Sequence, residues 1–120
     1  MDKKDRPMLV AYVAGPYRAS TTWKINQNIE RAKKVALEVW KMGYVAICPH
    51  ANTGLFDGEM PDKTWLDGDL ELLRRSDFVV LVPGWETSEG TKIEADLSSR
   101  LGKPVYTIHA LREKAKGEST

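Results

Sequence analysis

Carboxylate side chains gather in the second half of the chain. They are Asp67, Asp69, Asp77, Glu86, Glu89, Glu94 and Asp96. A carboxylate can attack an anomeric carbon because the transition state resembles an oxocarbenium ion, which the negative charge stabilises and then captures covalently. A second acid must protonate or orient the departing group, and its pKa must differ from that of the first. The set indicates glycosyl-bond chemistry, although most acids on helices are solvated surface groups.

The stretch from Asp77 to Leu97 reads as a strand, a turn and a helix. Residues 78–82 form an unbroken apolar, β-branched run, typical of a strand buried on both faces, and Pro83-Gly84 ends this run. In an open parallel sheet, ligands bind beyond the carboxyl ends of the strands, where the next helix offers free N–H groups to anions. We therefore expect the site at this turn.

Glu94 lies near the start of the predicted helix, which Thr87 or Ser88 can cap. The apolar positions that this helix would bury are Ile93, Leu97 and Leu101. Glu94 stands one position beyond that stripe, so its carboxylate can face the crevice. We take it as the candidate working residue; the alternative is a surface glutamate that only favours the helix dipole.

The other elements follow from the apolar pattern. Further strands are predicted at residues 8–14, 44–48 and 105–108, and further helices at about 24–42 and 65–76, the second capped by Asp62. Residues 51–62 form a loop that is long for a compact domain. Alternating strands and helices predict a single α/β domain, Rossmann-like or flavodoxin-like, with a parallel sheet of four to five strands flanked by helices. It spans residues 1–120, with 1–7 and 112–120 expected to be flexible.

In such a sheet the segments that follow three strands meet at one edge. These segments are Gly15–Ser20, Pro49-His50 and Gly84–Glu94. Their convergence is the main structural reason to expect a site, and it joins residues that lie far apart in the sequence.

Composition narrows the class of protein. The chain has 42% apolar and 29% charged residues, and its eighteen basic and seventeen acidic side chains leave a charge of +1, so bulk charge does not indicate binding to nucleic acid or membranes. Cys48 is the only cysteine, which fits a reduced compartment. No apolar stretch is long enough to span a membrane, and residues 1–8 lack the apolar block of a signal peptide. We expect a cytoplasmic protein.

Several familiar motifs do not match. Gly84 to Lys92 differs from a P-loop in glycine spacing and in the order of its last two residues. The first strand ends in Ala-Gly-Pro-Tyr, which is not the dinucleotide fingerprint, and no Gly-x-Ser-x-Gly elbow occurs. Two distant histidines, His50 and His109, with one cysteine make a zinc site unfavourable. We expect no metal and no organic cofactor.

Five short motifs in order carry a resemblance to a known family. They are YVAGPYR at 12–18, CPH at 48–50, DLELLRRSD at 69–77, SEGTKIE at 88–94 and GKPV at 102–105. Together they resemble the nucleoside 2-deoxyribosyltransferase superfamily, which includes the 2′-deoxynucleoside 5′-phosphate N-hydrolases and uncharacterised bacterial and phage relatives. The resemblance covers residues 9–108 and is closest to the uncharacterised relatives.

The resemblance implies roles for individual residues. Glu94 matches the nucleophilic glutamate, and Asp69 matches an aspartate that holds the deoxyribose and participates in catalysis. The substrate-binding residues that it implies, or that adjoin its motifs, are Gly15, Tyr17, Arg18, His50, Trp85, Ser88 and Gly90. Ser88 and Gly90 match the turn that meets a 5′-phosphate in the hydrolase branch.

Each role has a plainer alternative. Asp69 can be a solvated acid, Ser88 a helix cap, and Arg18 a surface residue. Tyr17 can be a packing residue with a hydrated hydroxyl, and His50 can hold loop backbone. Trp85 is either a lid that stacks on the base or an oligomer contact, and Trp23, Trp40 and Trp65 read as core or interface.

The implied reaction is cleavage or transfer at the N-glycosidic bond of a nucleoside or nucleoside 5′-monophosphate through a glycosyl-glutamate. Water as acceptor gives a hydrolase, and a second base gives a transferase. The rivals are a non-catalytic nucleotide-binding module and a purely structural assembly domain. The expected partner is a small nucleoside or nucleotide and not a nucleic acid polymer or membrane, and the family suggests a homodimer or larger homo-oligomer.

Overall fold

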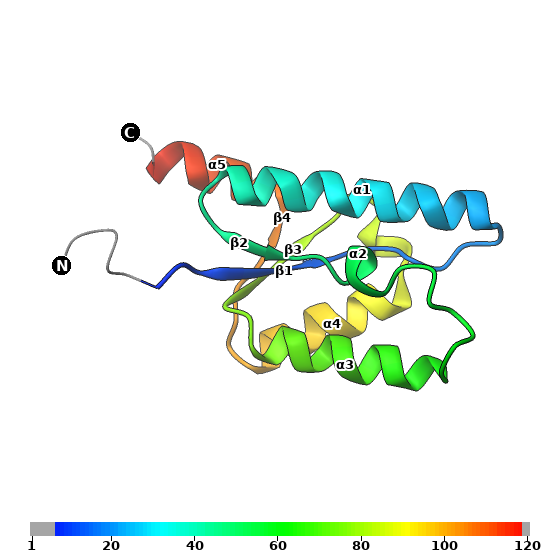
Figure 1. The fold of residues 1–120 in the computed structure, drawn as a ribbon. Helices are drawn as coiled ribbons and strands as arrows, with labels where there is room; N and C mark the ends of the chain where they lie inside the picture. The colour runs from blue at the N-terminus through cyan, green and yellow to red at the C-terminus, as the bar shows by residue number, and fades with distance from the viewer. Residues whose placement is uncertain (1–6, 119–120) are drawn as a thin grey trace.

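A computed structural model describes residues 7–118 as a parallel sheet between two layers of helices (Figure 1). The strands are β1 (Val10–Ala14), β2 (Val45–Ile47), β3 (Phe78–Leu81) and β4 (Val105–Thr107). The helices are α1 (Thr22–Lys41), α2 (Pro49–Thr53), α3 (Asp62–Arg74), α4 (Glu89–Arg100) and α5 (Ile108–Glu118), with a 3₁₀ turn η2 (Trp85–Thr87) before α4. The four strands are parallel in the order β2-β1-β3-β4. The predicted α/β fold class is confirmed.

Helices α1 and α5 cover one face of the sheet (Figure 1). The predicted helical spacing in α1 is confirmed, since its buried residues are Ile29, Ala32, Val35, Ala36 and Val39. Thr21 caps α1 by accepting the Lys24 N–H at 3.2 Å, and Gly43 follows it with a φ of 97° that only glycine adopts freely. Apolar side chains fill this layer from the sheet outward, with Val13 and Val80 meeting Leu111 of α5 in one core cluster.

Helices α3 and α4 cover the opposite face (Figure 1). Because neighbouring strand residues point to opposite faces, Tyr12 and Ala14 belong to this layer while Ala11 and Val13 belong to the other. The buried cluster on this side is smaller and includes Leu73 of α3.

The chain leaves β1 toward α1 on one face and leaves β3 toward α4 on the other. Adjacent strands whose connections diverge in this way create a topological switch point, and the crevice beyond their carboxyl ends is the usual ligand site. Tyr12 pairs with Val79 and Ala14 with Leu81 in the register between β1 and β3. The site predicted from the sequence therefore falls at the middle of the sheet.

Four expectations about the elements are wrong. The loop predicted over residues 51–62 is shorter, because residues 51–53 belong to α2 and Asp62 begins α3. The segment from residue 112 is not loose: α5 extends to Glu118, while residues 1–6 and 119–120 lie outside the described chain. Ile93 and Leu101 are 51% and 45% exposed, because α4 faces the sheet with the smaller residues Thr91, Ala95 and Ser98. Pro61, not Asp62, occupies the cap position of α3.

Candidate active site

A cavity of about 640 Å³ opens at the carboxyl edge of the sheet, between the loop after β1, helix α2, the first half of α3 and the start of α4. Except for Trp85, all of the residues predicted for the site line it: Gly15, Tyr17, Arg18, His50, Asp69, Ser88, Gly90 and Glu94. The convergence inferred from the parallel sheet is therefore observed. The volume falls in the range of pockets that hold small ligands.

Glu94 reaches the cavity from the second turn of α4, and its Oε2 accepts a hydrogen bond from the Tyr12 hydroxyl. Burial raises the pKa of Glu94 to about 7; the Tyr12 hydrogen bond opposes this change and the nearby charge of Asp69 adds to it. Burial and the Glu94 charge also raise the pKa of Tyr12, so the phenol remains a hydrogen-bond donor. The result is a carboxyl that is held by a fixed donor and titrates near neutrality.

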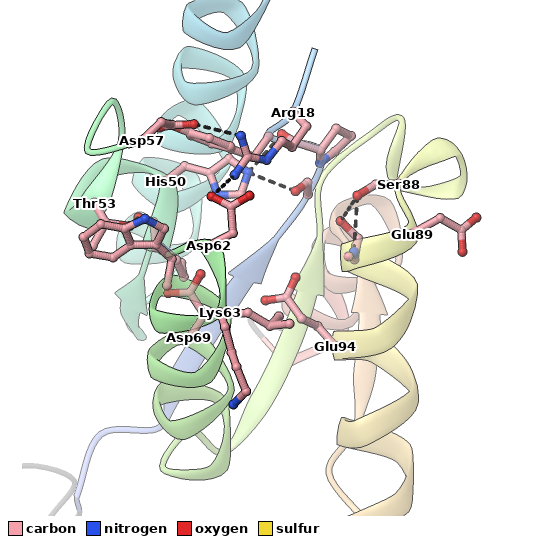
Figure 2. A pocket seen from close by; sticks show the side chains of 18 of the residues that line it. Arg18, His50, Thr53, Asp57, Asp62, Lys63, Asp69, Ser88, Glu89 and Glu94 are labelled. Atoms are coloured by element: carbon pink, nitrogen blue, oxygen red, sulfur yellow. Dashed lines mark hydrogen bonds and ion pairs between the residues drawn. The ribbon is translucent and has the colours of Figure 1, made fainter. Parts of the chain in front are cut away.

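Asp69 faces the same cavity from α3, on the wall across from Glu94 (Figure 2). Burial raises its pKa to about 6. Two carboxyls that titrate close together and near neutral pH can hold one carboxylate and one carboxylic acid at the same time. A pair of this kind can supply a nucleophile and an acid, the two groups that glycosyl chemistry uses.

Tyr12 is the residue that the sequence analysis missed. It is fully buried in the middle of β1, where its hydroxyl needs a partner. The sequence did offer one signal for it: Tyr12 is a tyrosine within an otherwise aliphatic run that was predicted to be buried. Because side chains alternate along a strand, Tyr12 lies on the face opposite Val13. The partner itself lies 82 positions away in the sequence and could not be read from the pattern.

His50 fixes the loop after β1. Its Nε2 lies 2.9 Å from both the Gly15 and the Pro16 carbonyl oxygens, and because both are acceptors, Nε2 carries the proton and donates. Burial lowers the pKa of His50, which favours the neutral ring. The ring also packs edge-on against Tyr17, with centroids 5.3 Å apart. Thus the plainer reading of His50, as a holder of loop backbone, is observed at the cavity wall.

The same loop is tied to the segment between α2 and α3, residues 54–61. The Tyr17 hydroxyl donates to Asp57 Oδ1 at 2.5 Å and accepts the Leu55 N–H at 2.8 Å. Arg18 pairs with Asp57 at 3.1 Å and with Asp62 at 2.8 Å. Figure 2 shows Arg18 between Asp57 and Asp62 along one rim of the cavity. These contacts hold residues 54–61, which form most of the long loop predicted from the sequence, against the loop after β1.

The N-terminus of α4 forms the opposite rim. Ser88 caps the helix, as predicted, by accepting hydrogen bonds from the Thr91 N–H at 3.2 Å and the Thr91 hydroxyl at 2.9 Å. Gly90 lines the cavity beside it. Ser88 therefore acts as a helix cap at the edge of the cavity.

Gly15 allows β1 and β3 to approach closely at their carboxyl ends. A Cβ at this position would lie 2.5 Å from Val82 Cβ, and the Val82 N–H donates to the Ala14 carbonyl at 2.8 Å. Such a separation is shorter than van der Waals contact, so a side chain at position 15 would force the strand ends apart.

Trp85 differs from its predicted place. It does not line the cavity; it lies in η2, is half-buried, and packs against the core cluster on the α3/α4 face. Trp23 and Trp40 are exposed on α1 and are not core residues. Trp65 lines the cavity, and its buried Nε1 lacks a hydrogen-bond partner among the residues that the structure describes.

Two further properties concern metals and membranes. Within residues 7–118, no group of three histidine, cysteine, aspartate or glutamate side chains is arranged to hold a metal ion. None of the helices described over the same range combines the length and hydropathy needed to cross a membrane.

The fold and the cavity define an α/β domain with a cavity at the switch point of its sheet. Residues 9–107 match the model of a domain family of unknown function, DUF4406, and the chain belongs to that family. The fold is similar to that of a 2-deoxyribosyltransferase from the psychrotolerant bacterium Bacillus psychrosaccharolyticus. The TM-score is 0.59 at 24% identity, over 82% of this chain and 70% of the other. Among curated proteins, none matches the chain.

Proposed function

We propose that this protein cleaves the N-glycosidic bond of a nucleoside or nucleotide, with Glu94 as the nucleophile. The observation that carries the proposal is the paired arrangement of Glu94 and Asp69 in one cavity, with the Tyr12 hydroxyl holding the Glu94 carboxylate. The 2-deoxyribosyltransferase with a similar fold supports the substrate class. These features support membership of the nucleoside 2-deoxyribosyltransferase superfamily.

In the first step a Glu94 carboxylate oxygen attacks the anomeric carbon of the sugar. A C–O bond forms, the C–N bond to the base breaks, and its electron pair leaves with the base, which takes up a proton. The positive charge that develops on the sugar favours the ionised form of Glu94, because opposite charges attract in a site with little water. Asp69 holds the sugar and orients the departing group.

In the second step an acceptor attacks the same carbon and releases Glu94. Water gives the free sugar and a proton, which completes hydrolysis. The nitrogen of a second base gives a new nucleoside and releases its own N–H proton, which completes transfer. The Tyr12 hydroxyl remains hydrogen-bonded to the carboxylate that departs, so it stabilises the returning negative charge.

Energetics favour an enzyme over a binding module of the same fold. Burying a carboxyl costs stability whenever the group is ionised, and the raised pKa of Glu94 expresses that cost. A module that only binds nucleotides has no need of a half-buried carboxyl near the anomeric carbon of the sugar. An enzyme of this kind does need it, because a nucleophile must lie beside the anomeric carbon that it attacks.

The test measures base release from a panel of 2′-deoxynucleosides and their 5′-monophosphates, with and without an acceptor base. We expect Glu94→Gln to lose at least about 10³-fold in kcat/KM. Asp96→Asn is the matched control, because Asp96 is an exposed carboxylate two residues further along α4 that pairs with Arg100 at 2.9 Å. Mass spectrometry of acid-quenched wild-type protein should find the sugar mass on the peptide that contains Glu94.

Two outcomes would overturn the proposal. One is no base release from any substrate while ligand binding persists in Glu94→Gln, which would leave the binding module. The other is base release that survives in Glu94→Gln, which would assign the chemistry to another group. Dependence of the products on the acceptor base separates transferase from hydrolase.

A further inference from the structure

Residues 54–61 contribute to the cavity rim but belong to neither a helix nor a strand. At this segment the Phe56 N–H donates to the Thr53 carbonyl and the Glu59 N–H donates to the Phe56 carbonyl, each at 3.1 Å. Both bonds close local turns, and neither joins the segment to the sheet. Contacts made by side chains therefore decide where the segment lies.

Tyr17 and Arg18, in the loop after β1, supply those contacts. The Tyr17 hydroxyl meets the segment at two points, Asp57 Oδ1 and the Leu55 N–H, and Arg18 pairs with Asp57 Oδ2. We call Tyr17, Arg18 and Asp57 the latch. The Arg18 side chain is 60% exposed, and ion pairs this close to water add little to stability. The latch can therefore release at a low cost in free energy.

Leu55 stores backbone strain beside the latch. Its φ is 67°, and within residues 7–118 it is the one non-glycine residue with a positive φ. This left-handed conformation costs free energy, because the Cβ approaches the following carbonyl oxygen. The hydrogen bond from the Leu55 N–H to the Tyr17 hydroxyl, at 2.8 Å, offsets part of that cost. Release of the latch relieves the strain, which favours movement of the segment.

The apolar side chains of the segment gain little from its closed position. Leu55, Phe56 and Met60 are 55%, 48% and 51% exposed. Phe56 packs edge-on against Trp65, with ring centroids 5.9 Å apart, yet the buried Trp65 Nε1 is without a hydrogen-bond partner in the described part of the chain. A buried donor left unpaired costs free energy in this state. Segments with few buried apolar contacts open more readily than the core.

The two ends of the segment are fixed, and its middle can turn. A Cβ at Gly54 would lie 2.2 Å from the His50 carbonyl oxygen, so the chain leaves α2 in a close approach that requires glycine. Pro61, with a φ of −57°, occupies the cap position of α3 and cannot change this angle freely. Gly58 between them has a φ of 88°, in the region that glycine enters at no steric cost. Movement is therefore confined to the part of the segment that carries Asp57.

We propose that residues 54–61 are a gate of the cavity, and that ligands enter and leave when Tyr17 and Arg18 release Asp57. In the closed state Arg18 lies across the rim between Asp57 and Asp62 (Figure 2), so release widens the mouth of the cavity. Tyr17 and Arg18 are positioning residues in this role. The gate needs no chemistry at Glu94, and it rests on the proposed function only for the ligand used in its test.

The first measurement is amide exchange of residue 55 by NMR, corrected for the intrinsic rate of each side chain. Asp57→Asn keeps the Tyr17 hydroxyl as acceptor but weakens the latch, so exchange should be about tenfold faster than in wild type. Leu55→Asn should slow exchange several-fold, because asparagine tolerates the left-handed conformation. The control is Glu71→Gln, which removes an arginine-paired carboxylate from α3 outside the cavity and should leave the rate unchanged.

The second measurement is the association rate constant of 2′-deoxyadenosine, followed by tryptophan fluorescence after rapid mixing. All of the proteins carry Glu94→Gln, so that bound ligand is not consumed. The rate constant should rise in Asp57→Asn and fall in Leu55→Asn by the factors found for exchange, and Glu71→Gln should match the parent. Leu55 is the sharper test, because it does not line the cavity and a purely structural role would not move the association rate.

Two results would overturn the gate directly. One is exchange in Asp57→Asn and Leu55→Asn at the rate of the control, which would show that the latch does not hold the segment. The other is altered exchange with an unchanged association rate, which would show that ligands enter elsewhere. Absence of binding in all of the proteins would overturn the gate together with the proposed substrate class. A failure of base release alone concerns Glu94 and leaves both measurements valid, because neither requires turnover.

Discussion

The two faces of the sheet differ in what they bury. On the α1/α5 face the strands contribute Ala11, Val13 and Val80 to an apolar cluster that extends to Leu111. On the α3/α4 face Tyr12 occupies the centre, and its hydroxyl reaches Glu94 at the cavity. One face follows the rule of close apolar packing, while the other gives up part of that packing to hold polar groups beside a cavity. The comparison indicates that the larger apolar core and the candidate site lie on opposite sides of the same strands.

The largest expected effect on stability comes from the apolar face. Leu111→Ala should lower the free energy of unfolding by about 2–5 kcal/mol, because Leu111 is 1% exposed and a cavity would remain in its place. Urea denaturation measures this change. Base release per folded molecule should stay at the wild-type value, since Leu111 lies on the face away from the site. A lower kcat in fully folded Leu111→Ala protein would show that packing on the α1/α5 face also affects the site.

Replacing Glu94 should stabilise the protein at high pH. The pKa of Glu94 is raised from 4.5 to about 7, so the folded state binds the proton more tightly and loses stability as pH rises through that window. Glu94→Gln should therefore exceed wild type by about 1–3 kcal/mol in unfolding free energy at pH 8 and match it near pH 4. Denaturation curves at both pH values measure the difference.

The control for that pH dependence is Glu30→Gln, which changes an exposed glutamate on α1 that pairs with Lys33 at 3.4 Å. Its stability relative to wild type should be nearly independent of pH between 4 and 8. If Glu94→Gln behaves in the same way as this control, Glu94 is not buried in solution.

Tyrosines on the two faces should behave differently. Tyr12→Phe removes the hydrogen bond that lowers the pKa of Glu94, so the acid limb of the kcat/KM profile should move to higher pH by up to about one unit. The stability change should be about 1 kcal/mol. Tyr106→Phe is the control, because Tyr106 packs edge-on to Phe78 at 5.7 Å on the other face. An unchanged acid limb in Tyr12→Phe would show that the hydroxyl does not govern Glu94.

The smallest effect should come from the apolar residues that α4 exposes. Ile93→Gln should change the unfolding free energy by less than about 0.5 kcal/mol, because Ile93 is 51% exposed. Leu97→Gln should cost more, since Leu97 packs against the α3/α4 core cluster. Light scattering of the same samples measures the molecular mass of the protein in solution and so reports its oligomeric state. A drop in mass with Ile93→Gln would make this face an interface between copies, as the predicted homo-oligomer requires.

The sequence predicted the sheet well because buried parallel strands are continuous apolar runs with glycine and proline at their ends. The meeting of Gly15, His50 and Glu94 followed from strand direction alone. The exposed Ile93 was predicted wrongly because hydropathy favours large apolar residues, whereas α4 approaches the sheet through small ones such as Ser98.

Contacts between distant residues could not be predicted. Helix α5 was missed because its fully buried apolar residues, Ile108 and Leu111, lie at one end and charged residues follow. The ion pairs of Arg18 join segments about forty positions apart, and exposed pairs of this kind leave no periodic pattern in the sequence. The sequence predicted which residues line the cavity, while the contacts that hold its rim could not be predicted.

Residues 54–61 connect two helices and take no part in the hydrogen-bonded sheet. They reach the cavity rim through side chains such as Asp57, tied to Tyr17. The segment can therefore vary among descendants of this chain at little cost to folding, while the strands beneath it stay fixed. A lineage, or a library built on this scaffold, can change which ligand is admitted by exchanging this one loop and leave Glu94 in its place.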